Sequence, residues 1–280
     1  MNTTRPMVMR DLRATFDEQG YVILPAFLEP EVVDGAHAAM EQLVEREAAR
    51  LVAAGRIADP FSGASFETRL ALLYADRPDE APKNFRPELH LAGLFPLFFH
   101  PHLLDLVETF LGGEIRLYPN YTARPKLPDH APTRVLWHQD GGYTSGEVAG
   151  LRMVNVWTPL VPVHVENGCM QFVPGTHRLG PVPHEPREHY LEIREDVLAE
   201  YVSRAVAIEM DPGDVVLFHN LLFHQGLPNR SQTIRWSLDW RYQDATQPTL
   251  RAENGHIARS HREPAAAVQS AAEWAQRSFG

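Results

Sequence analysis

The chain has 280 residues, of which 44% are hydrophobic and 22% are charged. This composition provides enough apolar residues for a sizeable core and excludes a largely disordered chain. The formal net charge of −10 argues against a surface that binds nucleic acid or an anionic membrane.

The sequence shows no sign of export or of a membrane segment. Cys169 is the one cysteine, so an intrachain disulfide and a cysteine-based metal site are both excluded. Residues 1–17 are polar and charged, unlike a secretory signal, and the longest apolar run, 91–99, is interrupted by Pro96. We therefore expect a cytoplasmic protein, either a monomer or a small homo-oligomer, with no nucleic-acid or membrane partner.

The part of the chain up to about residue 113 is predicted to be mainly helical. A short helix over 11–19 ends at Gly20, and a β-prone run follows over 21–27. A long amphipathic helix is expected from Pro30 to about residue 54. Two more helices are predicted over the ranges 66–74 and 101–111.

From residue 114 the pattern changes to short β-prone runs separated by Pro, Gly, Asn and Asp. These runs cover 115–123, 134–139, 151–163, 170–173, 205–210, 215–219 and 233–242. Helices followed by strands, without alternation, predict a mainly β fold with flanking α-helices and a double-stranded β-helix core, which is a cupin-like jelly roll. We expect a single domain over 1–280 with this core at about 114–243. In the tail, 244–280, an Ala-rich stretch over 265–275 can form a terminal helix.

His138 and Asp140 form a His-x-Asp pair at the end of a predicted strand. Side chains alternate along a strand, so both would point to one face. A second histidine from a distant strand would complete a set of two imidazoles and one carboxylate. That set is typical of non-haem Fe(II) sites, which leave positions open for a cosubstrate and O2. Taken alone, a His-x-Asp pair is more often two unrelated polar residues.

Two histidines compete for the third ligand position. His219 and His224 are five residues apart, so on one continuous strand they would face opposite ways. We favour His224, which is expected at a bend after the strand that begins at 215. His219 is then expected to be a hydrogen-bonded core histidine, and His177 to be structural, with its ring bonded to the backbone.

Residues 234–240 alternate between polar and apolar types, which places Arg235, Ser237 and Asp239 on one face of a strand. An arginine among apolar neighbours requires an anion. Asp239 could serve as a structural partner. We favour a bound keto-diacid instead, because a guanidinium beside a hydroxyl suits its far carboxylate.

Several segments resemble the phytanoyl-CoA dioxygenase family, and the likeness runs from about residue 16 to 242. They are WHQDGGY at 137–143, ENGCM at 166–170, VPGTHR at 173–178, GDVVLFH at 213–219 and HQG at 224–226, with Arg235. The resemblance implies an oxygenase that depends on Fe(II) and 2-oxoglutarate, built on a double-stranded β-helix. It implies that His138, Asp140 and His224 bind iron and that Arg235 holds the distal carboxylate of 2-oxoglutarate.

The resemblance also implies a reaction and further site residues. A dioxygenase of this kind uses O2 to hydroxylate an unactivated C–H bond of a small-molecule metabolite and releases succinate and CO2. Desaturation or cyclisation is the alternative outcome, and Asp140 favours hydroxylation because related halogenases have a small residue there. Asn120, Arg124 and Lys126 are candidates to touch the cosubstrate. Trp157 and Tyr143 are candidates for the substrate pocket, which segments 58–84 and 181–203 are expected to line or cover.

Three other functions fit parts of the pattern. A zinc hydrolase can use two histidines and a carboxylate, but it needs a general base and does not explain Arg235 with Ser237. A non-catalytic jelly-roll module that binds a metal or a small molecule has no need of open iron positions. An iron oxygenase without 2-oxoglutarate would lack the arginine pocket.

Overall fold

The computed structural model describes residues 5–143, 150–187 and 191–279. Its helices are α1 (Arg5–Gln19), α2 (Pro30–Ala53), α3 (Arg69–Leu73), α4 (Phe95–Phe98), α5 (Pro101–Leu111), α6 (Glu195–Leu198) and α7 (Ala271–Gln276). Its strands are β1 (Tyr21–Leu24), β2 (Glu114–Leu117), β3 (Thr122–Lys126), β4 (Val135–His138), β5 (Met153–Pro159), β6 (Met170–Val173), β7 (His184–Pro186), β8 (Leu191–Ile193), β9 (Val206–Ile208), β10 (Val215–His219), β11 (Phe223–Gly226), β12 (Arg235–Asp244) and β13 (His256–Ser260).

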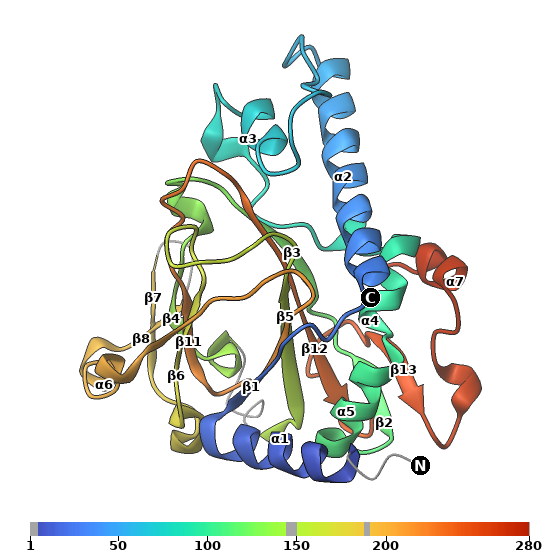
Figure 1. Ribbon diagram of the computed structural model, residues 1–280, viewed down its shortest axis with the longest axis vertical. Coiled ribbons are helices and arrows are strands. Elements are labelled where there is room, and N and C mark those ends of the chain that lie inside the picture. Colours follow the sequence, from blue (N-terminus) through green and yellow to red (C-terminus); the bar gives the residue numbers. More distant parts are fainter. Residues whose placement is uncertain (1–4, 144–149, 188–190, 280) are drawn as a thin grey trace.

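Two antiparallel sheets form the centre of the molecule (Figure 1). The larger sheet has the order β1-β10-β5-β12-β2-β13, with β3 also paired to β12, and the smaller has the order β4-β11-β6-β9. Strands β7 and β8 form a separate hairpin, and α2, α4, α5 and α7 lie on one side of the molecule, beside the larger sheet (Figure 1). This arrangement confirms the predicted mainly β fold with flanking helices around a jelly-roll core.

The larger sheet is buried on both faces because its strands alternate between two apolar cores. In β10, Val215 and Leu217 belong to the core shared with the helices, whereas Val216 and Phe218 belong to the core between the two sheets. This is the period of two that a strand imposes on its side chains. The sheet therefore has one helix-covered face and one face turned toward the smaller sheet.

Strand β12 follows the same rule but turns polar residues inward. Trp236, Leu238 and Trp240 are fully buried in the core shared with the helices. The alternate residues of the strand therefore face the smaller sheet; they are Arg235, Ser237, Asp239 and Arg241. The predicted alternation of this segment is thus confirmed, and it brings charged side chains to the inside of the jelly roll.

Helix α2 packs against α3 and α4 because it has one apolar side. Pro30 occupies the first turn, where the missing backbone N–H costs nothing. The buried side of the helix consists of Ala36, Ala39, Met40, Leu43, Val44, Ala48 and Leu51. Burial of each large side chain stabilises the fold by about 1.5–3 kcal/mol. None of the helices in the described ranges has the length and apolarity that crossing a membrane requires.

The structure differs from the sequence-based expectation at four places. The run 115–123 is divided into β2 and β3, because Pro119 interrupts it. His224 lies within strand β11, not at a bend, and Asp140 lies in a short 3-10 turn (Asp140–Tyr143), not on the strand. The segment after residue 243 contributes β13, which pairs with β2 at the edge of the larger sheet.

Candidate metal centre

Three side chains that can bind a metal ion meet beside the smaller sheet. His138 of β4 and His224 of β11 are paired residues of adjacent antiparallel strands, with ring centroids 4.0 Å apart. Asp140 follows β4, with its Oδ1 3.6 Å from His138 Nε2 and its Oδ2 3.8 Å from His224 Nε2. One potential ligand atom from each residue lies within 4.8 Å of the other two. The fold thus assembles the predicted set from positions far apart in the sequence.

Backbone carbonyls fix the orientation of both imidazoles. His138 Nδ1 lies 2.8 Å from the carbonyl oxygen of Leu136, and His224 Nδ1 lies 2.9 Å from that of Leu222. A carbonyl oxygen can only accept, so each Nδ1 donates its proton and each Nε2 keeps its lone pair. Burial, together with the nearby His138, lowers the pKa of His224 to about 3. His224 is therefore neutral at physiological pH, as metal binding requires.

Both carboxylate oxygens of Asp140 are held by hydrogen bonds. Arg241 Nη2 donates to Oδ1 at 2.5 Å, and Asn155 Nδ2 donates to Oδ2 at 2.7 Å. Arg241 and Asn155 are paired residues of β12 and β5, so they approach Asp140 together. Burial would raise the pKa of Asp140, but Arg241 and the two histidines hold it well below its usual range. Asp140 is thus an ionised carboxylate in a fixed orientation.

Asn155→Ala is expected to weaken Fe(II) binding by roughly 10- to 100-fold, because partners of metal ligands orient those ligands. Removing the amide leaves Asp140 Oδ2 without its donor, while both histidines stay in place. Equilibrium dialysis of Fe(II) under anaerobic conditions measures the effect. Asn167→Ala is the control, because the Asn167 side chain bonds only the backbone of a turn. Equal iron affinity in the two variants would show that Asn155 does not orient the ligand.

The three residues line a cavity between the two sheets. The other lining residues are Arg124, Val135, Trp157, Met170, Phe218, Gln225, Gly226, Arg235, Asp239 and Arg241. Two imidazole nitrogens and a carboxylate oxygen suit Fe(II) and similar transition-metal ions. The donor set and the adjoining cavity therefore fit a metal that keeps open positions for other ligands.

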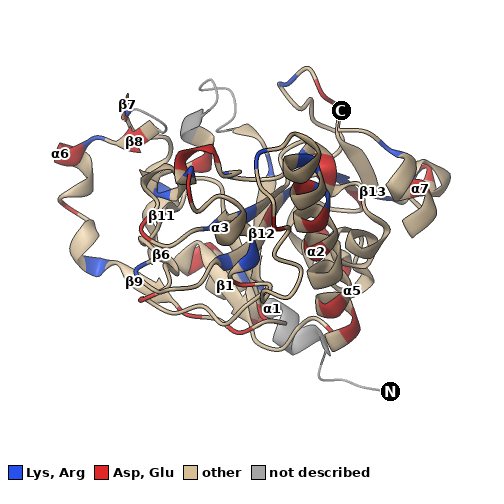
Figure 2. Cartoon of the chain, turned by 90° about the horizontal axis from the view of Figure 1, so that it is seen from above, with Lys and Arg blue, Asp and Glu red and all other residues tan. Residues whose placement is uncertain are grey.

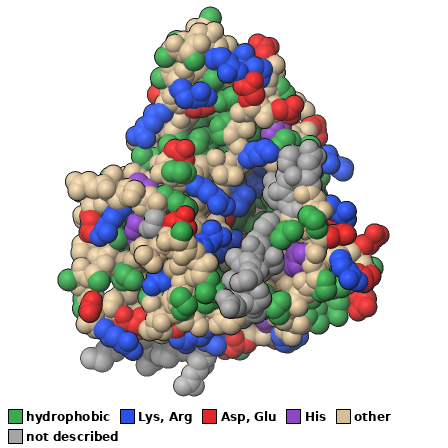
Figure 3. Space-filling model, turned by 180° about the vertical axis from the view of Figure 1, so that it is seen from behind, with side chains coloured by type: hydrophobic (Ala, Val, Ile, Leu, Met, Phe, Trp, Pro, Cys, Tyr) green, Lys and Arg blue, Asp and Glu red, His purple; other side chains and the backbone are tan. Residues whose placement is uncertain are grey.

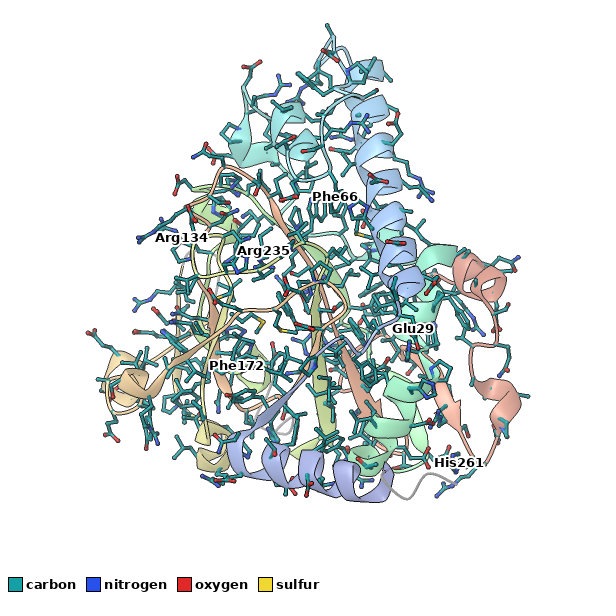
Figure 4. The ribbon with its side chains drawn as sticks, viewed as in Figure 1. Glu29, Phe66, Arg134, Phe172, Arg235 and His261 are labelled. Carbon is teal, nitrogen blue, oxygen red and sulfur yellow. The ribbon has the colours of Figure 1, made fainter. Side chains whose placement is uncertain are left out.

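Arg235 is buried in this cavity, and no carboxylate of the described residues forms an ion pair with it. Arg235 is 3% exposed, its Nη1 donates to Ser237 Oγ, and its Nε has no hydrogen-bond partner. The guanidinium carbon lies 5.5 Å from the ring centre of Trp157, and Figure 4 shows Arg235 between the two sheets. Asp239, its alternative structural partner, is bonded to Arg124 Nε at 2.5 Å. A buried guanidinium in this state favours binding of an anion.

A second buried cation lies next to Arg235. Lys126 of β3 is the register partner of Arg235, is 3% exposed, and donates from Nζ to the carbonyl oxygen of Leu227. Burial, and then the charge of Arg235, lower the pKa of Lys126 well below its usual range. Two adjacent cations with only neutral hydrogen-bond partners repel each other, so a bound anion would stabilise both.

The remaining predicted residues are placed as follows. Arg124 lines the cavity but is paired with Asp239, whereas Asn120 is not among the lining residues. The backbone carbonyl of Asn120 accepts a bond from Arg241 Nη1 at 3.3 Å. The side chain of Tyr143 lies outside the described part of the structure.

The two segments expected to line or cover the pocket contribute none of the described lining residues. Segments 58–84 and 181–203 are both absent from the cavity wall, which strands provide instead. His184 Nε2 does accept the backbone N–H of Gln139 at 3.1 Å, so the second segment supports the strand end that carries His138.

His219 lies away from the metal ligands, as the sequence predicts. Its ring centroid lies 5.2 Å from that of His177 and 6.2 Å from that of Phe16, and its Nδ1 accepts the Leu221 N–H at 3.1 Å. His177 Nε2 lies 3.2 Å from the Asp17 carbonyl oxygen, which confirms the expected bond from that ring to the backbone. Both histidines therefore join α1 and β1 to the end of β10.

The burial of His219 predicts a pH-dependent stability of the metal-free protein. Burial, together with the nearby His177, lowers the pKa of His219 to about 4. Below pH ~6.5 the unfolded chain therefore binds a proton that the folded chain does not, and stability is lost as the pH falls from ~6.5 toward 4. His219→Asn keeps an acceptor for Leu221 and should reduce this loss. Urea unfolding midpoints at pH 7.5 and pH 5 measure it, and an unchanged difference between them would contradict the assignment.

Arg241 and Asn155 are site residues that the sequence analysis did not identify. Arg241 continues the alternation of Arg235, Ser237 and Asp239 by one more step, so the same pattern could have found it. Asn155 had no comparable signal, because strand β5 is buried at every position and its phase cannot be read from the sequence.

Comparison with known proteins agrees with this geometry. The sequence matches the family described as Phytanoyl-CoA dioxygenase (PhyH) over residues 16–237. A 1-deoxypentalenic acid 11-beta-hydroxylase of Streptomyces arenae is 30% identical over 244 residues, which cover 82% of this chain and 80% of that protein.

Two solved structures from nogalamycin biosynthesis share the fold. The epimerase SnoN in complex with Fe3+, alpha ketoglutarate and nogalamycin RO has a TM-score of 0.58 and 26% identity, covering 87% of this chain and 88% of its own. The alpha ketoglutarate dependent carbocyclase SnoK has a TM-score of 0.56 and 25% identity, covering 84% of each chain. The family match extends over most of the sequence, including both histidines and the carboxylate. The chain belongs to the phytanoyl-CoA dioxygenase family.

Proposed function

We propose that the chain uses Fe(II), 2-oxoglutarate and O2 to hydroxylate an unactivated C–H bond of a small-molecule metabolite, with release of succinate and CO2. One observation carries the proposal. A three-residue metal site and a buried cation without an anion, Arg235, open into the same cavity. Iron chemistry and a dicarboxylate cosubstrate are therefore both accommodated in one place.

The metal site would consist of His138, Asp140 and His224. When bound, iron supplies the chemistry that activates O2 and oxidises the substrate. The chain's own residues keep the ligands ready for it. Backbone carbonyls hold both imidazoles in the tautomer with a free Nε2, and Arg241 with Asn155 keeps the Asp140 carboxylate ionised and oriented.

The distal carboxylate of 2-oxoglutarate would bind to Arg235 and the hydroxyl of Ser237, with Lys126 contributing a second positive charge. Arg235 and Lys126 are register partners on neighbouring strands, so one carboxylate can lie near both. The face of Trp157 lies beside the Arg235 guanidinium and limits where the cosubstrate can lie. Strands carry all of these residues, and a rigid scaffold positions reacting groups precisely.

A zinc hydrolase would need a carboxylate or histidine free to act as a general base. Of the described residues that line the cavity, both acidic ones are bonded to arginines: Asp140 to Arg241 and Asp239 to Arg124. Both lining histidines belong to the metal site itself. This arrangement favours the oxygenase, because its base-free chemistry needs only the metal, the cosubstrate and O2.

Conversion of 2-oxoglutarate to succinate tests the proposed function. The purified protein is incubated with Fe(II), 2-oxoglutarate and O2, with and without a panel of metabolites. We expect succinate formation that a metabolite of the panel stimulates and that stops when zinc replaces iron. Hydrolysis of a substrate without consumption of 2-oxoglutarate would contradict the proposal.

A second outcome of the same oxidation is supported by the solved relatives. SnoK is described as a carbocyclase and SnoN as an epimerase, both dependent on alpha ketoglutarate. Ring closure or desaturation would remove two hydrogens from the substrate, whereas hydroxylation adds one oxygen. The product mass after reaction with 18O2 therefore separates these outcomes, and an 18O-labelled alcohol is the expected product.

We also propose that the chain works in the cytoplasm, as a monomer or a small homo-oligomer without a nucleic-acid or membrane partner. The acidic net charge of −10 supports the part of this proposal that concerns nucleic-acid and anionic-membrane partners. Size-exclusion chromatography with light scattering measures the oligomeric state.

A further inference from the structure

Four arginines gather on the side of the cavity formed by β3, β12 and the loops beside them. Arg124 and Arg241 line the cavity itself. Arg86 and Arg251 are not lining residues, but Arg86 bonds Thr122, the register partner of the lining residue Asp239. The charges of Arg124, Arg241 and Arg251 all act on Arg86. Figure 2 shows basic residues beside β12, and Figure 3 shows Lys and Arg side chains along a hollow on the rear face. This cluster is notable in a chain whose net charge is −10.

Arg86 is held in place by the edge of the larger sheet. The preceding residue, Phe85, forms an isolated β-bridge with Ala123 of β3, with backbone bonds of 2.9 and 3.0 Å. The Phe85 ring stacks on Trp236, with centroids 6.2 Å apart. The Arg86 Nε then donates to Thr122 Oγ1 at 3.1 Å. Arg86 is therefore positioned by β3, and the rest of its guanidinium remains available.

The arginines are only partly neutralised. Arg124 is paired with Asp239 and Arg241 with Asp140, so these two charges are balanced. Arg86 is bonded to a hydroxyl, and its neighbour Glu88 accepts the backbone N–H of Arg86 instead of its guanidinium.

Arg251 also has neutral contacts. Its Nε donates to the hydroxyl of Tyr118 at 3.1 Å, and its guanidinium carbon lies 5.5 Å from the ring centre. Across the described ranges, no carboxylate forms an ion pair with Arg86 or Arg251. Bound Fe(II) and the 2-oxoglutarate dianion would together add no net charge to the site, because their charges are opposite and equal in size.

Burial makes the remaining charge on Arg86 costly. Arg86 is half-buried, and burial followed by the charge of Arg124 lowers its pKa. Asp239 acts in the opposite direction, but Arg241 and Arg251 add to the lowering. A guanidinium in such surroundings gains from an anion that can accept two parallel hydrogen bonds. A carboxylate has that geometry.

We propose that the substrate of this oxygenase is a carboxylic acid whose carboxylate binds Arg86, with Arg251 adding positive charge at the same place. The inference rests on the proposed function and names the substrate class for that site. The cavity also has apolar lining residues, Val135, Met170 and Phe218, which suit a hydrocarbon. An acid held at Arg86 would extend its hydrocarbon part past Asp239 and Arg124 into the cavity that the three metal-binding candidates line. A thioester or an amide of the same acid would lose the ion pair.

Matched acids and amides test this inference. The probes are cyclohexanecarboxylate and decanoate, each compared with its primary amide. They are titrated into the anaerobic protein loaded with Fe(II) and 2-oxoglutarate, and binding is followed by the shift in the charge-transfer absorbance. We expect at least one acid to bind the wild-type protein about tenfold or more tightly than its amide.

The variants separate charge recognition from a structural role. Arg86→Gln should remove the preference for the acid and leave amide binding unchanged, and Arg86→Lys should retain part of the preference because it keeps the charge. Arg116→Gln is the control, because Arg116 is also half-buried but bonds Gln243 and backbone carbonyls of the tail. It should bind both probes as the wild type does.

The outcomes distinguish this inference from the proposed function. Equal affinity for acid and amide in the wild type, or an acid preference that survives in Arg86→Gln, would overturn the substrate class while the charge-transfer absorbance remained intact. Absence of that absorbance in the wild type would contradict the proposed function, and the inference would fail with it.

Discussion

His224→Ala is expected to abolish Fe(II) binding and all oxidation of 2-oxoglutarate, whereas His219→Ala should leave iron bound. His224 Nε2 is directed at Asp140, and its Nδ1 is fixed by the Leu222 carbonyl. Loss of a partner that merely orients a ligand costs about 10- to 100-fold in metal affinity. Loss of one of three protein ligands should cost more than that.

His219→Ala is the matched control because it removes another histidine, five residues earlier in the sequence, at the end of β10. Its ring contacts His177 and Phe16, not the metal ligands. Iron content after anaerobic loading and gel filtration, together with succinate formation, gives the result for both variants. If His219→Ala lost iron while His224→Ala retained it, the assigned ligand set would be wrong.

Arg235→Ala is expected to weaken 2-oxoglutarate binding by roughly 10- to 100-fold, which corresponds to a charge-assisted hydrogen bond of about 1.5–3 kcal/mol. Arg235→Lys should also bind more weakly, because an ammonium cannot reproduce the planar fork of the guanidinium. Iron binding should persist in both variants, since Arg235 touches none of the three ligands in the structure. Lys126 would remain as a neighbouring cation and account for the residual affinity.

Titration of 2-oxoglutarate against the charge-transfer absorbance of the Fe(II) protein measures this loss. Arg259→Ala is the control, because Arg259 pairs with Glu108 and Asp105 of α5, outside the cavity. An unchanged affinity in both Arg235 variants would mean that the distal carboxylate is held by other residues.

The parts of the site that the sequence could predict are those with a local signal. His138 and Asp140 are separated by one residue, and Arg235 lies in a strand with a clear alternation. The three predicted ligand residues do lie together, although their local geometry differs from the expectation. Asp140 projects from a turn after the strand, and His224 lies inside β11.

What the sequence could not predict depends on pairings between distant strands. Asn155 and Arg241 meet at Asp140 because β5 and β12 are adjacent in a register that no local pattern specifies. Likewise Arg86 is placed beside β3 by the bridge between Phe85 and Ala123, which lie far apart in the sequence.

The fold shows the same division between local and distant signals. Helices α2 and α5 were predicted well because each has an apolar side and a proline in its first turn. Strand β13 was missed because it follows a polar stretch and joins the sheet only through β2, at the edge. A short edge strand needs few apolar residues, so its sequence resembles a loop.

The central claim is that one cavity holds both iron and 2-oxoglutarate, through His138, Asp140 and His224 on one side and Arg235 on the other. The most direct measurement is a titration of 2-oxoglutarate into the anaerobic protein with and without one equivalent of Fe(II). We expect a saturable charge-transfer absorbance that requires iron and is absent in His224→Ala. Iron binding without this absorbance, or an absorbance that survives in His224→Ala, would contradict the account.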